Sequence, residues 1–295
     1  MSAPAERAGV IHDIGYRRYA GTRVGRRGIA ASLLASGVLA VFGFGRSGRA
    51  KILPFVLLGM TLVPAVVQVG IMSFIGLDAD LLNYAGYNSG SSFLVVLFVA
   101  AQAPVLFSRD LRSGVISLYL ARPLGATAFA LIRWASLVLA ILAFVLTPLL
   151  VLFIGGLTAG ASFREEIGPV AWALGGAVVL ALLVATVSAL VASWTLRRGL
   201  AIAGTIMVLM VGLGVTVALK ETLFAEGMDT AAHWVSLLSP FALVDAVTAV
   251  LGDTAGQISQ APGSALTGWL LLLAALALMA GGLLLLVRRY RSKGA

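Results

Sequence analysis

Six apolar stretches, each near the length needed to cross a bilayer, constrain the fold of this 295-residue chain more than any other feature. A transmembrane helix needs about 20 predominantly apolar residues. The predicted spans are residues 52–77, 92–107, 129–157, 168–195, 200–219 and 266–287. Charged residues make up only 11% of the sequence, far below the quarter usual in soluble domains. The sequence therefore predicts an all-α polytopic membrane protein with six transmembrane helices.

The charges outside these spans predict an orientation. With six crossings both termini share a side, and 19 of the 21 Lys and Arg residues fall on that side, whereas nine of the twelve acids fall on the other. By the positive-inside rule the termini are cytoplasmic. The net charge of +9 is then explained by attraction to anionic lipid headgroups. Nucleic-acid binding is the weaker alternative, and no nucleic-acid partner is expected.

Three parts follow from this topology. Residues 1–51 form a basic cytoplasmic segment, residues 52–287 the transmembrane domain, and residues 288–295 a basic cytoplasmic tail. Within the first part, the apolar run at residues 29–44 is too short for a normal span and has basic residues on both flanks. Its apolar residues Leu34, Val38 and Phe42 oppose two serines, which favours an amphipathic elbow helix lying in the membrane interface. A flexible basic tail is the alternative.

The external region at residues 220–265 is the longest loop and contains a second apolar run, residues 233–251. A seventh span here would move the basic tail outside, and Pro240 and Asp245 interrupt the run. Irregular backbone at membrane depth is tolerated where protein or water covers it. We therefore expect a broken pair of re-entrant helices before the last span.

Small residues recur at every fourth position of the fourth span. They are Ala173, Ala177, Ala181, Ala185, Ala189 and Ser193. Such a stripe lets helix backbones approach closely, within the bundle or across a dimer interface. The alternative is chance in an Ala-rich chain.

No catalytic, cofactor or metal site is predicted. The chain has no cysteine, and its two histidines, His12 and His233, fall on opposite sides of the membrane. The sequence GFGRSGR at residues 43–49 matches a dinucleotide pattern, but without the preceding strand that such a motif requires. The paired acids of the short external loops, Glu165 and Glu166 among them, are expected to be solvated.

Charged residues are absent from the middle of the spans, which argues against a self-powered transporter. The polar residues nearest mid-span are Gln68, Gln102 and Thr147. Each is a candidate to face a translocation path, although hydrogen bonding to a neighbouring helix is the leading alternative.

The loop between the second and third spans, residues 108–128, carries the most informative polar sequence. A charged start and a glycine precede an apolar helix-like segment, and Pro123 ends it. Such a surface helix could dock into a partner's groove, or pack on the chain's own elbow. The candidate contact residues are Arg109, Asp110, Arg112, Gly114, Leu118, Tyr119 and Arg122.

With these features the chain resembles the permease subunits of type 2 ABC exporters. The resemblance lies in the order of elbow, six spans, coupling helix and broken external helices. It also lies in a local pattern formed here by Asp110, Ser113, Gly114, Val115, Leu118, Leu120, Arg122, Pro123 and Leu124. The family often has Glu at the position of Asp110 and Thr at that of Val115.

The resemblance implies a permease that forms the translocation path as a dimer in the inner (plasma) membrane. Two separate cytoplasmic ATPase subunits would bind ATP and Mg and drive it, so the chain itself would be no enzyme and carry no cofactor. The second permease chain would be identical or a paralogue. An integral membrane enzyme, a self-contained transporter or channel, and an anchor subunit without transport remain the alternatives.

Overall fold

The structure, a computed structural model, describes residue 21 and residues 25–75, 83–108, 124–195, 197–252 and 264–294. Every regular element in these ranges is a helix. In chain order they are α1 (Arg26–Val41), α2 (Arg49–Ile75), α3 (Tyr84–Gly90), α4 (Ser92–Leu106), α7 (Ala126–Thr158), α8 (Phe163–Trp194), α9 (Arg198–Ala225), α10 (Asp229–Val235), the 3-10 turn η2 (Ser236–Leu238), α11 (Pro240–Gly252) and α12 (Ala265–Gly294).

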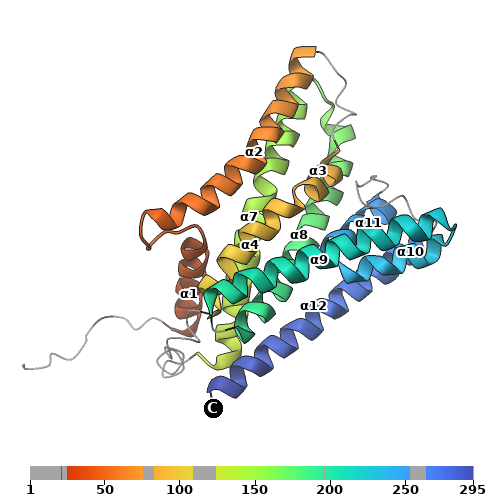
Figure 1. Cartoon of the computed structure of the whole chain (residues 1–295). Coiled ribbons are helices and arrows are strands. Elements are labelled where there is room, and N and C mark those ends of the chain that lie inside the picture. Colours follow the sequence, from red (N-terminus) through yellow and green to blue (C-terminus); the bar gives the residue numbers. More distant parts are fainter. Residues whose placement is uncertain are drawn as a thin grey trace, which may run out of the picture.

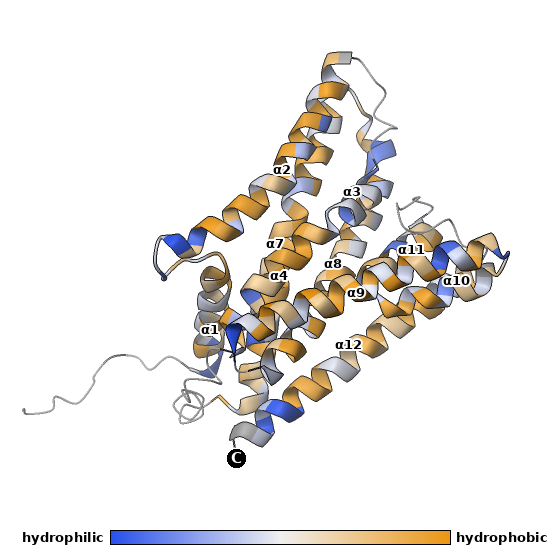
Figure 2. Ribbon diagram, in the orientation of Figure 1, coloured by the Kyte–Doolittle hydropathy of each residue, from blue (hydrophilic) through white to orange (hydrophobic). Residues whose placement is uncertain are grey.

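Five of these helices, α2, α7, α8, α9 and α12, are long and apolar enough to cross a membrane (Figure 2). The predicted second span is α4, which continues from α3 through a bend of 53° at Ser91. Counting this bent pair as one span gives six, as the sequence predicts. The protein is thus a helical, multi-pass membrane protein by the length and composition of its helices.

Helices α7 and α8 form the centre of the bundle (Figure 1). They pack against each other, α1 and α2 pack on α7, and α11 and α12 pack on α8. The small-residue stripe of α8, from Ala173 to Ser193, is buried along its whole length. Because small side chains bring backbones close together, α8 can have several neighbours at once.

Helix α1 runs beside the bundle and turns sharply into α2. Gly43 has a φ of 82°, and a Cβ there would lie 2.7 Å from the backbone of Ala50, so the turn requires glycine. The residues of α1 that are buried are Leu33, Gly37 and Val41, and a Cβ on Gly37 would lie 2.3 Å from the Ser136 hydroxyl of α7.

The elbow prediction and this packing differ in register. The predicted apolar face of Leu34, Val38 and Phe42 is only half-buried, because close approach to α7 selects the glycine-containing face instead. That α1 lies in the membrane interface stays a prediction.

Candidate functional site: a buried polar cluster at the acidic end

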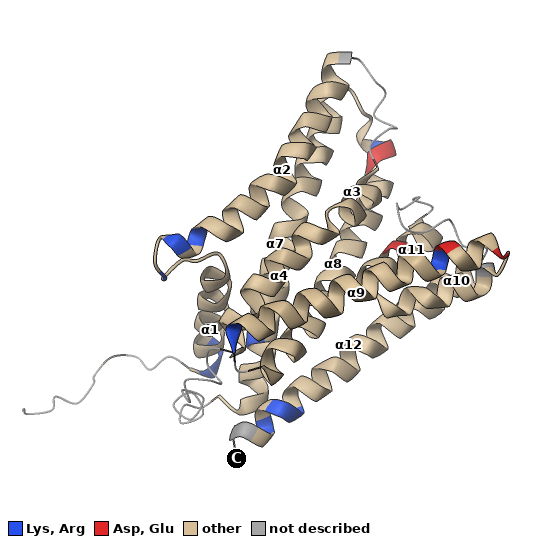
Figure 3. Cartoon of the chain, in the orientation of Figure 1, with Lys and Arg blue, Asp and Glu red and all other residues tan. Residues whose placement is uncertain are grey.

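Charges separate to the two ends of the bundle (Figure 3). The basic residues at the starts of α1, α2 and α9 and at the end of α12 gather at one end, called here the basic end. The acids of α8, α9 and α11 lie at the opposite, acidic end, where Arg164 and Lys220 are the described cations. Basic and acidic residues thus lie at opposite ends of the helices, as the alternation of charge between successive loops predicts.

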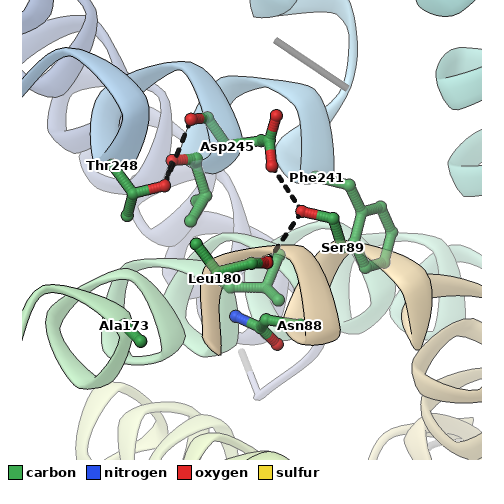
Figure 4. Close-up of a pocket in the computed structure, with 9 residues that line it drawn as sticks. Asn88, Ser89, Ala173, Leu180, Phe241, Asp245 and Thr248 are labelled. Carbon is green, nitrogen blue, oxygen red and sulfur yellow. Dashed lines mark hydrogen bonds between the residues drawn. The ribbon is translucent and has the colours of Figure 1, made fainter. Parts of the chain in front are cut away.

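At the acidic end a buried polar cluster joins α3, α9, η2 and α11. Asp245 of α11 and Lys220 of α9 are only 3% and 2% exposed, and they interact electrostatically. Ser89 of α3 donates a hydrogen bond to Oδ1 of Asp245, and the two side chains point toward one another in Figure 4. Lys220 Nζ donates to Ser236 Oγ across 3.2 Å. Four elements are therefore linked through two opposite charges.

A second buried contact lies beside this cluster. The hydroxyl of Tyr84, on α3, donates to Oε2 of Glu166, on α8, across 2.6 Å. Both side chains are buried, so Glu166 differs from the solvated loop charge expected from the sequence, whereas its neighbour Glu165 is exposed. Glu166 belongs to the first turn of α8, and the fold of α3 over that turn covers it.

A small cavity of about 10 Å³ adjoins the cluster between α3, α8 and α11. The polar residues that line it are Asn88, Ser89, Asp245 and Thr248, and the buried Oδ1 of Asn88 accepts no hydrogen bond within the described residues. Space of this size suits one water molecule rather than a substrate. The cluster is thus built to hold helices together, because buried charges separated from their partners are costly.

The cluster was not predicted as a site, although one signal pointed to it. Asp245 is the only charge in an apolar run, and an ionisable residue in such a run is a functional candidate by default. The sequence interpretation treats Asp245 as a helix interruption. In the structure α11 continues through it, and the chain breaks earlier, at Ser239, which has extended backbone.

The three polar mid-span candidates lie on three different helices. Gln68 of α2 is half-buried, Gln102 of α4 is 3% exposed, and the Thr147 hydroxyl of α7 donates to the carbonyl of Ala143 in its own helix. No hydrogen bond joins any two of them in the described part of the chain. The Oε1 atom of Gln102 is buried and accepts none there, which leaves Gln102 as the most unusual of the three.

The predicted ATPase-contact residues lie outside the described residues. This applies to Arg109, Asp110, Arg112, Gly114, Leu118, Tyr119 and Arg122. The helices on either side of them are described, however, and both are tied to the bundle. Ser108 Oγ donates to the carbonyl of Ala192 at 2.7 Å, and Arg291 Nε donates to Thr127 Oγ1 at 2.9 Å.

No group of three or more His, Cys, Asp and Glu side chains is placed to hold a metal ion within the described ranges. Comparison with models of known protein families gives no match, and comparison with curated proteins gives none either. We conclude that the chain is a multi-pass helical membrane protein with opposite charge at its two ends and a buried polar cluster at the acidic end.

Proposed function

We propose that this chain is the membrane-spanning permease subunit of an ATP-driven exporter of the type 2 ABC class. It would form the translocation path as a dimer, powered by two separate cytoplasmic ATPases. The basic end would face the cytoplasm of a cell with this protein in its inner membrane. The proposal rests on the family resemblance of the sequence and on the arrangement of the helices.

The observation that carries it is the α10–η2–α11 segment. It is a chain of short helices, too short to span, placed at the acidic end directly before the last long helix. The sequence predicts a re-entrant pair of helices at this position. Its buried cluster explains how polar backbone and charge at that depth are covered by protein.

The flanks of the predicted coupling loop support a mechanical role. One flank, at Ser108, is bonded to the end of α8, and the other, at Thr127, to the end of α12. A push on residues 108–128 would thus reach the central helix α8 and the last helix together. Rigid-body rocking of the bundle is the expected response to closure of the ATPases.

The Lys220–Asp245 interaction favours one second candidate, a self-contained transporter. Ionisable residues among membrane helices commonly mark ion or proton pathways. In that case transport would respond to an ion gradient rather than to ATP, and Asp245→Asn would abolish it.

The test is co-expression of the full chain with the ATPase encoded beside its gene. We expect the two to co-purify with ATP hydrolysis, and Leu118→Ala with Tyr119→Ala to weaken both. Leu219→Ala at the acidic end is the matched control and should leave both unchanged. A chain that never retains the ATPase, yet moves solutes in ATP-free vesicles, would support the second candidate instead.

Orientation has its own test, because the chain has no cysteine. The exposed residues Ser47 and Glu226 lie at opposite ends of the bundle, and each can be replaced by a single cysteine. A membrane-impermeant maleimide added to intact cells should label Glu226→Cys and spare Ser47→Cys. The reverse pattern would invert the proposed topology.

A further inference from the structure

A wide cleft lies at the side of the bundle, between α9 and α12. Its volume is about 750 Å³, within the range of pockets that bind small molecules. Helices α8 and α11 form its floor, where Leu183 and Leu243 are almost completely buried, and Leu209 of α9 lines it and is buried as well. Its lips are about half exposed, notably Leu278 at 54% and Leu285 at 50%. The cleft therefore opens sideways, toward the surroundings of the bundle.

Its lining is almost entirely apolar. Thr186 is the polar exception, and its hydroxyl is already engaged, because it donates to the Leu182 carbonyl at 2.7 Å and accepts from Trp134 Nε1 at 3.1 Å. A polar solute would find no free side-chain hydroxyl, amide or charge there to replace its hydration. A hydrocarbon chain has no hydrogen bonds to lose on entering.

The cleft leads toward a cation. On α12, residues 274, 278, 282 and 285 line it, and Arg289 continues the same helical stripe one turn further. Arg289 is half-buried, and its Nε makes no hydrogen bond to the described protein. None of the described acids lies at this end (Figure 3). The stripe thus runs from an apolar cleft to a guanidinium that suits an anionic group.

The dimensions match one leaflet of a bilayer. Residues 274–285 of α12 rise roughly 17 Å, and Arg289 lies roughly 6 Å beyond. Half of the hydrocarbon core is about 15 Å thick. An acyl chain that filled the cleft would place its phosphate at the level of Arg289.

We propose that this cleft binds one acyl chain of an anionic phospholipid from the leaflet at the basic end, with the phosphate held by Arg289. The lipid would join α9 and α12, which flank the cleft and both pack on α8 and α11. This site is independent of the transport function proposed above, since it needs neither the ATPase nor a substrate.

The probe is a phosphatidylglycerol with a diazirine on one acyl chain, added in trace amount to phosphatidylcholine vesicles that contain the full-length chain. After irradiation, labelled peptides are mapped by mass spectrometry. We expect labelling to concentrate on α8, α9 and α12 at the cleft, and unlabelled phosphatidylglycerol to compete better than phosphatidylcholine or a free fatty acid.

Two variants separate the cleft from the charge. Gly281 lines the cleft and has open space at its Cβ, so Gly281→Phe should fill it and lower cleft labelling about tenfold, equivalent to ~1.4 kcal/mol. Gly59→Phe on α2, also in open space, is the matched control. Arg289→Gln should reduce the preference for phosphatidylglycerol about fivefold, as expected for one basic residue near anionic lipid. Arg27→Gln, at the exposed start of α1, should not.

Should Gly281→Phe fail to purify as a folded protein, Ala277→Phe fills the same cleft from an exposed position. Labelling spread equally over the exposed face of α2 would overturn the proposal, because the lipid would then be ordinary solvent for the protein. Equal competition by phosphatidylcholine or fatty acid would overturn the role of Arg289. Cross-links between two copies of the chain through the cleft would assign it to a dimer interface instead.

Discussion

Helices α8 and α9 follow one another in the chain and are both apolar enough to span a membrane, yet they have opposite surroundings. In the most apolar stretch of α8, 56% of the residues are buried, against 22% in α9. The difference lies in the small-residue stripe of α8, which brings neighbours close, and in its absence from α9. Hydropathy selects a helix for the membrane, and small side chains then select it for the centre of the bundle.

The peripheral helices α9 and α12 pack on several neighbours, and each has one contact that a single substitution can test. Lys220 ties α9 to η2 and α11 at the acidic end, and Gly282 of α12 sits against Thr186 of α8, where a Cβ would lie 2.3 Å from Cγ2. Between these points α9 and α12 present apolar faces outward. Substitutions at the points of attachment should therefore cost as much as substitutions in the centre.

The largest effect is expected for Asp245→Ala. Lys220 would remain buried without its opposite charge, which costs about 3–5 kcal/mol. The free energy of unfolding of the purified protein, from titration with SDS, measures the loss. Glu226→Ala, an exposed acid at the end of α9, is the control and should change it by less than about 0.5 kcal/mol. Equal effects of the two substitutions would mean that the cluster does not hold α9.

Next comes a direct comparison of centre and periphery. Leu180 of α8 is 2% exposed and Leu273 of α12 is 61% exposed. Leu180→Ala should cost about 2–4 kcal/mol because it leaves a cavity, and Leu273→Ala less than about 0.5 kcal/mol. The same titration with SDS measures the free energy of unfolding of both variants. A large loss at Leu273 would indicate that a protein partner covers this face of α12.

The attachment of α12 can be tested with one methyl group. Gly282→Ala should cost about 1–3 kcal/mol through overpacking against Thr186. Thr186→Ser removes the clashing Cγ2 but keeps the hydroxyl that accepts from Trp134, so it should restore most of the stability in the double variant.

The neighbouring Gly281 provides the control for that cycle, since a Cβ there meets nothing within 4 Å. Gly281→Ala should be neutral or stabilising by up to about 1 kcal/mol, given the helix propensity of alanine. If Gly281→Ala and Gly282→Ala change the free energy of unfolding equally, the contact between α12 and α8 is looser than the structure shows.

Among the buried contacts tested, the smallest loss of stability is expected at the Tyr84–Glu166 hydrogen bond. Tyr84→Phe should cost about 1–2 kcal/mol, because the Glu166 carboxyl would lose its buried donor. In a Glu166→Gln background the cost should shrink, whereas Glu165→Gln, at an exposed position, should not alter it. Thermal unfolding of the wild-type protein, the three single variants and the two double variants in one detergent gives the coupling. An unchanged cost in both backgrounds would show that Tyr84 acts through its ring alone.

Much of this architecture was predictable from one sequence. The six apolar stretches and the alternation of charge between them can be read directly from the sequence, and the helices α2, α7, α8, α9 and α12 overlap the predicted spans. The break before Pro240 in the external region was predictable because proline and an apolar run of that length conflict with a simple span. The bend between α3 and α4 was not, since no proline or charge lies at Ser91.

Local composition and the thickness of a bilayer are therefore enough to tell which segments are helices and which of them suit a membrane. Which face each helix buries was decided only by tertiary structure. Packing against α7 selected the Gly37 face of α1, and the fold of α3 over α8 and α11 buried Glu166 and Asp245. Such choices depend on residues far apart in the chain, whose side chains meet only once the helices have assembled.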